Sequence, residues 1–342
     1  MPVFFNSQPG SCIKIGLINN MSDEALKATE RQFISLLDSA SDKMPVHLSF
    51  YTLPGVPRNG LTASHISRRY SNIEDLWDGH LDGLIVTGRD PMAANLADEP
   101  YWDSFTRVLA WAEENCHATV LSCLAAHAAI LSMDGIGRVK ENDKVFGIFD
   151  CARVSDHPLT AGTASQFRLP HSRWNGVPEE QLADCGYEVL TRSASAGVDT
   201  FIKQQKRLFV FFQGHPEYES DTLLREYRRD VGRYIKGDVP RYPLMPRSYF
   251  DETTVEELAA FEKKAVSQRS EELLPELNAI LEDKTIANTW QASAAGIYRN
   301  WLGYICAQKE TVLVAKRLQV IAGGEQILGA SYLSTLLLED VG

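Results

Sequence analysis

The chain has 342 residues, of which 44% are hydrophobic and 23% charged, and a net charge of −11 at pH 7. This length predicts one large domain with additions, or two domains. The negative charge argues against nucleic acid and against an anionic membrane as partners. No stretch reaches the roughly 20 apolar residues of a membrane span, and the first residues lack a signal-peptide pattern. We therefore expect a soluble, cytoplasmic protein, and the charge says little about a small substrate.

Short apolar runs alternate with amphipathic segments in the first half of the chain. Apolar runs predict strands, and segments with helical spacing predict helices. The predicted strands are Ile13–Asn19, Val46–Tyr51, Gly83–Val86 and Ala118–Ser122. The predicted helices are Ala25–Ser39, Phe105–Asn115 and Ala125–Met133. This alternation predicts an α/β fold, a three-layer sandwich with a mostly parallel sheet between helices.

The second half adds strands and then becomes helical. The predicted strands are Phe146–Phe149, Glu188–Leu190, Thr200–Lys203 and Leu208–Phe212. Prolines near residue 240 predict a loop. A charged helical stretch, Val255–Leu281, and a more apolar helix, Trp290–Cys306, follow it. We expect a catalytic α/β domain over residues 1–240 and a helical C-terminal extension over residues 241–342, packed on that domain.

Six cysteines are spread along the chain without a CxxC pair. They are Cys12, Cys116, Cys123, Cys151, Cys185 and Cys306. This spacing does not predict a zinc site or a thioredoxin-type motif. In a reducing compartment the thiols stay free, and one of them can be a reactive nucleophile while the others fill the core.

Cys123 is the cysteine whose local sequence indicates chemistry. The predicted strand Ala118–Ser122 runs directly into it, and small residues and a helix follow. Such a strand–turn–helix exposes a nucleophile at the carboxyl edge of a sheet. The helix amino terminus lowers the pKa of a thiol, and backbone N–H groups in the turn can hold an oxyanion. A cysteine alone is more often a structural residue, so a second feature is needed.

The segment Gly214–Tyr218 supplies that second feature, directly after a predicted strand. His215 at a strand end can act as general base for a thiol, and Glu217 can orient the imidazole and stabilise its protonated form. Taken alone, the pair is somewhat better explained as a loop histidine beside an incidental glutamate. Cys123, His215 and Glu217 in one sheet together predict a Cys–His–Glu triad, as in class I glutamine amidotransferases.

The chain resembles the homoserine O-acyltransferases of the homoserine O-succinyltransferase type, which have a glutamine-amidotransferase-like, flavodoxin-like fold. Besides the two features above, the matching segments are Leu17–Met21, Thr29–Gln32, Gly83–Gly88, Tyr101-Trp102, Lys144–Phe149, Pro170–Arg173, Glu226–Asp230 and Asn300–Leu302. No single motif is decisive, but the order and compatible spacing of all of them indicate the family. The last stretch, residues 311–342, lies beyond the resemblance and is expected to be a terminal helix or an oligomer contact.

The resemblance implies a role for each matching residue. Cys123 carries the acyl group as a thioester, His215 is the general base, Glu217 is its partner, and the backbone N–H of Leu124 donates to the oxyanion. Three further residues hold the amino acid acceptor: Lys144, Ser172 and Arg229. A guanidinium can grip an α-carboxylate in a bidentate manner. Without the resemblance, a surface ion pair explains Arg229 and a solvated loop charge explains Lys144.

Two departures from the family pattern concern specificity. The family usually has Cys-Trp-Gly-Ala-Gln at the nucleophile, where this chain has Cys123-Leu124-Ala125-Ala126-His127. In the family, glutamate at a position after Thr87-Gly88 goes with acetyl donors and glycine with succinyl donors. Spacing assigns that position to Met92, which is neither. Arg89 lies close in sequence and can pair with a succinyl carboxylate, unless Asp90 neutralises it.

We therefore expect ping-pong acyl transfer from an acyl-CoA co-substrate, succinyl-CoA weakly preferred over acetyl-CoA, to the hydroxyl of homoserine. The family places this step in methionine biosynthesis. It needs no metal and no bound cofactor, and we expect a homodimer. One alternative keeps the fold but acylates serine or a specialised-metabolite acceptor. A glutaminase-like hydrolase and a non-catalytic binding protein are the others. The retained triad residues argue against the last, and the absence of an obvious synthetase domain argues against the glutaminase.

Overall fold

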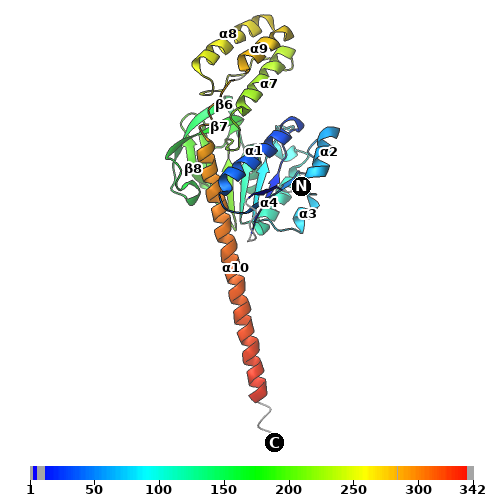
Figure 1. Ribbon diagram of the computed structural model, residues 1–342, viewed down its shortest axis with the longest axis vertical. Coiled ribbons are helices and arrows are strands. Elements are labelled where there is room, and N and C mark those ends of the chain that lie inside the picture. Colours follow the sequence, from blue (N-terminus) through cyan, green and yellow to red (C-terminus); the bar gives the residue numbers. More distant parts are fainter. Residues whose placement is uncertain (1–2, 6–11, 283, 337–342) are drawn as a thin grey trace.

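A single mixed sheet runs through the body of the molecule (Figure 1). The computed structural model describes residues 3–5, 12–282 and 284–336. In chain order, the strands are β1 (Val3–Phe5), β2 (Ile13–Ile18), β3 (Val46–Tyr51), β4 (Gly83–Thr87), β5 (Ala118–Ser122), β6 (Val139–Arg153), β7 (Gln166–Gly176), β8 (Glu188–Ser193), β9 (Gly197–Gln204) and β10 (Leu208–Phe212). Their order across the sheet is β1-β3-β2-β4-β5-β10-β9-β8-β6-β7.

The sheet is parallel at its centre and antiparallel on both sides. Strands β3, β2, β4, β5 and β10 run parallel to their neighbours in this central block. Strand β1 pairs antiparallel with β3, and β9, β8, β6 and β7 extend the other side with antiparallel pairs. The predicted α/β class is confirmed, and the parallel arrangement holds for the central strands while the complete sheet is mixed.

Helices cover both faces of the sheet and make the three layers. Helix α1 (Asp23–Ser41) packs on one face and shares a hydrophobic core with the last helix, α10 (Gln291–Leu336). Helices α4 (Trp102–Asn115) and α5 (Leu124–Asp134) form a second core on the other face. The shorter helices are α2 (Gly60–Arg69), α3 (Glu74–Trp77) and α6 (Glu179–Asp184). Strands β4, β5 and β10 are buried along their whole length, as expected for strands that are covered on both faces.

Strands β6 and β7 form a long hairpin that the apolar pattern predicted only in part. The pattern predicted residues 146–149, but β6 begins at Val139 and ends at Arg153, and no strand was predicted at β7. The first half of β6 is polar and partly exposed. Pairing with β7 therefore holds this half of β6 in the extended form of a strand. The pairing register shifts between Lys140 and Val145.

The helices after the sheet divide into a group at one end of the molecule and the long helix α10. Helix α7 (Thr222–Lys236) lies beside α8 (Glu252–Gln268) and α9 (Leu274–Leu281) at one end of the molecule. The predicted single helical stretch over residues 255–281 is wrong, because α8 stops at Arg269, whose φ of 38° lies in the left-handed region.

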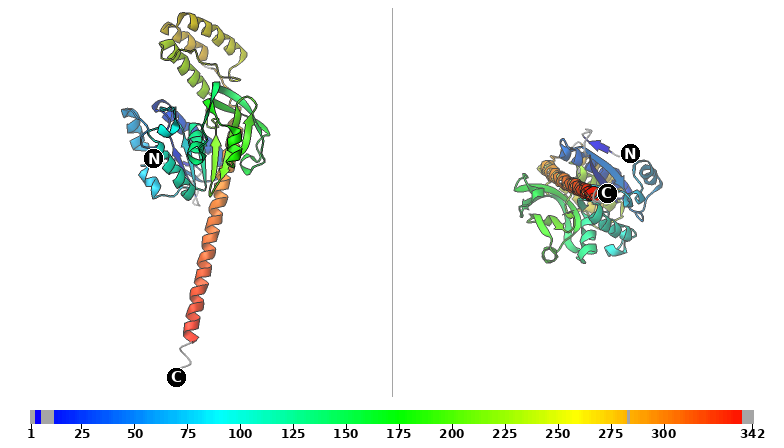
Figure 2. Two further views of the ribbon diagram at one scale, coloured as in Figure 1. Left: turned by 180° about the vertical axis from the view of Figure 1, so that it is seen from behind. Right: turned by 90° about the horizontal axis from the view of Figure 1, so that it is seen from below.

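Helix α10 packs on the sheet and then runs past the body of the molecule at the opposite end (Figures 1 and 2). It contains residues 291–306 of the predicted helix and continues through residues 311–336. Residues 337–342 lie outside the described part. None of the described helices is long and apolar enough to cross a bilayer. The domain boundary at residue 240 stays a prediction.

Candidate active site

Cys123 lies in a sharp turn between β5 and α5 at the carboxyl edge of the parallel strands. Its φ is 53°, a conformation that costs a non-glycine residue energy. The backbone N–H of Cys123 donates to the carbonyl of Phe212 at 2.8 Å, which fastens the turn to the end of β10. The N–H groups of Leu124 and Ala125 follow at the start of α5, before the first bonds of the helix, which run from Ala126 and His127 to the carbonyl of Cys123. Those donors point a positive dipole end at the thiol.

Gly88 makes close packing behind this turn possible. A Cβ added at residue 88 would lie 2.4 Å from the Cβ of Leu124 and 2.7 Å from the backbone nitrogen of Ala125. The N–H of Gly88 also donates to the carbonyl of Ser122 at 3.3 Å. The loop after β4 therefore supports, by direct contact, the turn that carries Cys123.

We expect Gly88→Ala to displace that turn and to lower turnover together with stability. Overpacking of this kind costs roughly 1–3 kcal/mol of unfolding free energy. Thermal unfolding and steady-state rates measure the two effects. Gly137→Ala is the matched control, since a Cβ there meets nothing within 4 Å. A Gly88→Ala variant with the unfolding temperature and rate of the control would show that the contact is unimportant.

His215 and Glu217 follow β10 and lie beside Cys123. The Nδ1 of His215 is 2.9 Å from Oε1 of Glu217, and the ring stacks on Tyr218 with centroids 4.1 Å apart. Burial lowers the pKa of His215, but the charges of Cys123 and Glu217 and its hydrogen bonds to both outweigh burial and raise this pKa well above its ordinary value. These interactions favour the protonated imidazole between the sulfur of Cys123 and the carboxylate of Glu217.

Glu217 is buried, and sequence reasoning missed the residues around it. Ser122 Oγ lies 3.5 Å from Oε1 of Glu217, whereas Oε2 has no hydrogen-bond partner among the described residues. Helix α10 places Tyr298 close by: burial and the charge of Glu217 raise the pKa of this phenol well above its usual value. No local pattern could have indicated Tyr298, which lies 81 positions from Glu217 in the sequence.

A buried pair, His171 and Asp199, supports the loop that carries His215. His171 Nε2 lies 3.2 Å from Asp199 Oδ1, and the N–H of Gly214 donates to the same oxygen at 3.2 Å. Burial lowers the pKa of His171. Burial raises the pKa of Asp199, but its bonds to His171 and two threonines outweigh this and lower it. This fully buried pair was also missed by the sequence analysis.

Lys144 and Ser172 meet around one carboxylate next to the triad. Ser172 Oγ donates to Oε2 of Glu226 at 2.5 Å, and Lys144 Nζ lies 3.6 Å from the same oxygen and 3.3 Å from Oδ2 of Asp230. Tyr218, which stacks on His215, donates its hydroxyl to the other oxygen of Glu226 at 2.7 Å. Hydrogen bonds and ring stacking thus connect the predicted acceptor residues to the triad.

Arg229 joins this group through Asp230. Its Nε and one terminal nitrogen lie 2.9 and 2.8 Å from Oδ1 of Asp230, and its side chain is 46% exposed. Burial lowers the pKa of Arg229, but the charges of Asp230, Glu226 and Asp90 outweigh this and raise it. The surface ion pair considered for Arg229 is present, and it lies at the edge of the predicted acceptor site.

The two residues predicted to set donor specificity lie in the loop after β4. Arg89 donates from Nε to the backbone carbonyl of Asp90 at 3.3 Å, and one of its terminal nitrogens is buried without a partner among the described residues. Met92 is 47% exposed. Its N–H and that of Ala93 donate to the buried carboxylate of Glu99, a residue that sequence reasoning missed.

His127, in the first turns of α5, is a packing residue. It is buried, and burial, with Arg173 and Arg138, lowers its pKa to about 3. The imidazole is therefore neutral at pH 7.

A thiol, an imidazole and a carboxylate at the carboxyl edge of a parallel sheet form the arrangement of enzymes that move acyl groups through a cysteine. The chain belongs to the homoserine O-succinyltransferase family, whose model matches residues 5–312. It is an acyltransferase, and the resemblance noted in the sequence is confirmed.

Named relatives match most of the chain. The homoserine O-succinyltransferase of Rhodopseudomonas palustris is 44% identical over 290 residues, which is 85% of this chain and 87% of that protein. That of Bradyrhizobium japonicum is 43% identical over 294 residues, 86% and 90% of the two chains. Among solved structures, a glutamine amidotransferase from Methylobacillus flagellatus matches with a TM-score of 0.47 and 15% identity over 86% of this chain and 94% of that one.

Proposed function

We propose that this enzyme transfers a succinyl group from succinyl-CoA to the hydroxyl of L-homoserine through a thioester on Cys123. The family match over residues 5–312 carries the proposal. The contacts among Cys123, His215 and Glu217 support its mechanism.

In the first half-reaction, the thiolate of Cys123 attacks the thioester carbonyl of the acyl-CoA. Backbone N–H groups at the start of α5, that of Leu124 first, donate to the oxyanion that forms. The carbon–sulfur bond to CoA then breaks, and the protonated His215 gives its proton to the departing CoA thiolate. The acyl group remains on Cys123, and His215 is left neutral.

In the second half-reaction, the neutral His215 takes the proton of the homoserine hydroxyl. The oxygen attacks the acyl-enzyme carbonyl, the bond to sulfur breaks, and Cys123 returns as a thiolate beside protonated His215. Glu217 stabilises the imidazolium in this step, as its 2.9 Å contact with Nδ1 permits. The ester product carries the acyl group on oxygen.

The group around Glu226 suits a zwitterionic acceptor. Lys144 and Arg229 offer positive charge to an α-carboxylate, while Glu226 and Asp230 offer negative charge to an α-ammonium. Ser172 adds a hydroxyl that already bonds to Glu226. An amino acid bound here exchanges its own charges for the present ion pairs, and its side-chain hydroxyl is directed toward His215.

The succinyl preference is supported by Arg89 and by the names of the relatives. Arg89 donates one hydrogen bond, from Nε to the backbone carbonyl of Asp90. It forms no ion pair with the Asp90 carboxylate in the described part of the chain. It follows Gly88, which contacts the residues after Cys123. Arg89 is therefore close to the nucleophile turn and available to a succinyl carboxylate, and uncharged Met92 does not repel one.

We expect Arg89→Ala to lower kcat/KM for succinyl-CoA about tenfold to a hundredfold and to leave the value for acetyl-CoA nearly unchanged. A charge-assisted hydrogen bond is worth about 1.5–3 kcal/mol. Arg168→Ala, which removes an exposed arginine paired with Asp150 on the β6–β7 hairpin, is the control. A wild-type preference for acetyl-CoA that Arg89→Ala leaves unchanged would refute the succinyl assignment.

Intact-protein mass spectrometry tests the whole reaction. The enzyme is mixed with succinyl-CoA or acetyl-CoA, and homoserine or serine is added in a second step. We expect a succinyl adduct that homoserine discharges and serine does not. If serine discharges the adduct and homoserine does not, serine is the acceptor. If no adduct forms and product appears only when both substrates are present, the mechanism is not ping-pong.

The state of the cysteines bears on where the reaction takes place. All six cysteines are free thiols, which fits a reducing compartment, and we place the enzyme in the cytoplasm with the acyl-CoA it uses. The family places this step in methionine biosynthesis. The homodimer stays a prediction.

A further inference from the structure

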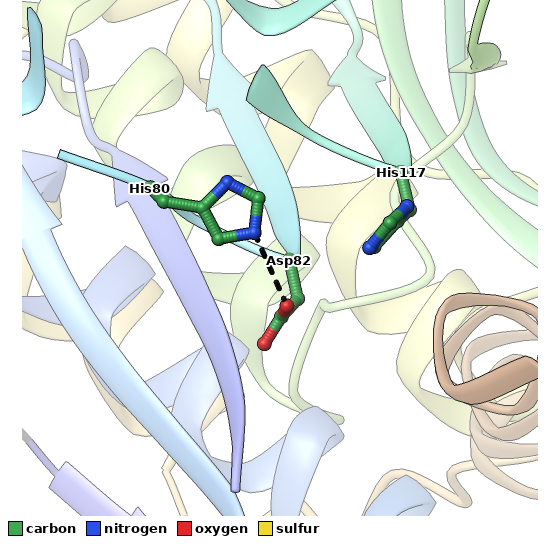
Figure 3. A group of neighbouring side chains, drawn as sticks. All are labelled: His80, Asp82 and His117. Carbon is green, nitrogen blue, oxygen red and sulfur yellow. Dashed lines mark ion pairs between the residues drawn. The ribbon is translucent and has the colours of Figure 1, made fainter. Parts of the chain in front are cut away.

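Two histidines and an aspartate lie together at the sheet edge opposite Cys123. Asp82 directly precedes β4, His117 directly precedes β5, and His80 lies two residues before Asp82 (Figure 3). One ligand atom from each of the three lies within 4.8 Å of the others. Because parallel strands start at the same edge, β4 and β5 bring these residues together at the end farthest from the triad.

The backbone fixes Asp82 and His117 relative to each other. The N–H of His117 donates to the carbonyl of Asp82 at 2.9 Å, and the N–H of Asp82 donates to the carbonyl of Lys14 at 2.8 Å. The Oδ2 of Asp82 accepts from the Lys14 N–H at 2.8 Å and from Lys309 Nζ, on α10, at 2.7 Å. These bonds occupy Oδ2, and Oδ1 lies 3.6 Å from Nε2 of His80.

His117 gives a second, independent indication of a ligand. Only 5% of this residue is exposed, and its Nδ1 is buried with no hydrogen-bond partner in the described part of the chain. A buried polar atom without a partner is uncommon and costly, and an ion is one explanation for it. The side chain of His80 is 59% exposed, so an ion can reach the group from solvent.

We propose that His80, Asp82 and His117 bind one divalent transition-metal ion of the zinc class. Two imidazoles and a carboxylate are a common ligand set for such ions, with a fourth position left to water. Ligands bound at 2.0–2.2 Å stand about 3.4 Å apart in a tetrahedral site, so the group has to contract. His80 makes this movement because it is exposed, while the other two are buried.

Lys309 and Lys14 act as the outer shell of this site. They hold Oδ2 and so direct Oδ1 toward the histidines, as bonds to metal-ligating carboxylates do elsewhere. The positive charges of Lys309 and nearby Arg207 oppose a dication and weaken its binding. The bound ion joins the segment before β4 to the start of β5, beside the contact with α10. Its role is structural and separate from acyl transfer.

Metal titration of the tag-free chain, dialysed against a chelator, tests this site. Cobalt(II) is followed by absorption and zinc(II) by calorimetry, in wild type, His80→Asn and His157→Asn. His157 is the matched control because its Nδ1 only accepts from the N–H of Leu159, a contact that asparagine can replace. We expect one equivalent in wild type and control, with at least about tenfold weaker binding in His80→Asn.

Thermal unfolding adds a second measurement on the same variants. Zinc should raise the unfolding temperature of wild type and His157→Asn, because a ligand that binds only the folded state stabilises it, and should have less effect on His80→Asn. Equal binding in His80→Asn and wild type would overturn the proposal, as would no binding at all. A thiolate-to-cobalt charge-transfer band would place the ion on a cysteine and also overturn it.

Discussion

Replacing Cys123 with alanine should abolish both the acyl-enzyme and turnover. In the proposed mechanism the sulfur of Cys123 forms the covalent bond, and this residue lies beside His215 in the turn between β5 and α5. Mass spectrometry after mixing with succinyl-CoA should show no adduct, and product should not form above the uncatalysed rate. The fold should survive, since alanine is smaller and Cys123 is only half-buried.

Cys185→Ala is the matched control for this variant. Cys185 is a half-buried free thiol at the end of α6, and its loss should leave the adduct and the rate at wild-type levels. An adduct that still accumulates fully on Cys123→Ala would assign the nucleophile to another residue. Loss of the adduct on Cys185→Ala instead would point to that cysteine.

Glu217→Gln should lower kcat by about 10⁴, the size of the effect measured for the orienting carboxylate of a serine protease triad. Glutamine keeps the shape of the side chain but removes the negative charge beside His215 Nδ1. The protonated imidazole then loses one of the charges that raise its pKa. The rate should fall at every substrate concentration, because the loss affects the protonated state formed during reaction.

Glu219→Gln controls for the removal of a nearby carboxylate. Glu219 is in the same loop and pairs with Arg31 and Arg225 at the surface, so its loss should change the rate little. Circular dichroism and thermal unfolding should show a folded Glu217→Gln protein. A folded variant with nearly normal kcat would remove Glu217 from the mechanism.

Local sequence was sufficient for the central strands and for placing Cys123, His215 and Glu217 at one edge of the sheet. Strands β4, β5 and β10 are buried along their whole length, so they appear as short, mostly apolar runs. Cys123 and His215 come directly after such runs, and parallel strands end at one edge of a sheet. The proximity of Cys123 and His215 could therefore be predicted from the two apolar runs that precede them and from the rule that parallel strands end at the same edge.

Tertiary structure alone decided which polar residues meet. Lys144 and Asp230 are 86 positions apart, and Asp82 and Lys309 are 227 apart. Their contacts depend on strand order and on where α7 and α10 pack, and hydrophobic periodicity carries no information about either. The polar half of β6 shows the same limit, because its strand form comes from pairing with β7 and not from its own residues. Sequence thus determined the elements buried on both sides, while contacts between distant polar side chains were decided by the packing of the whole chain.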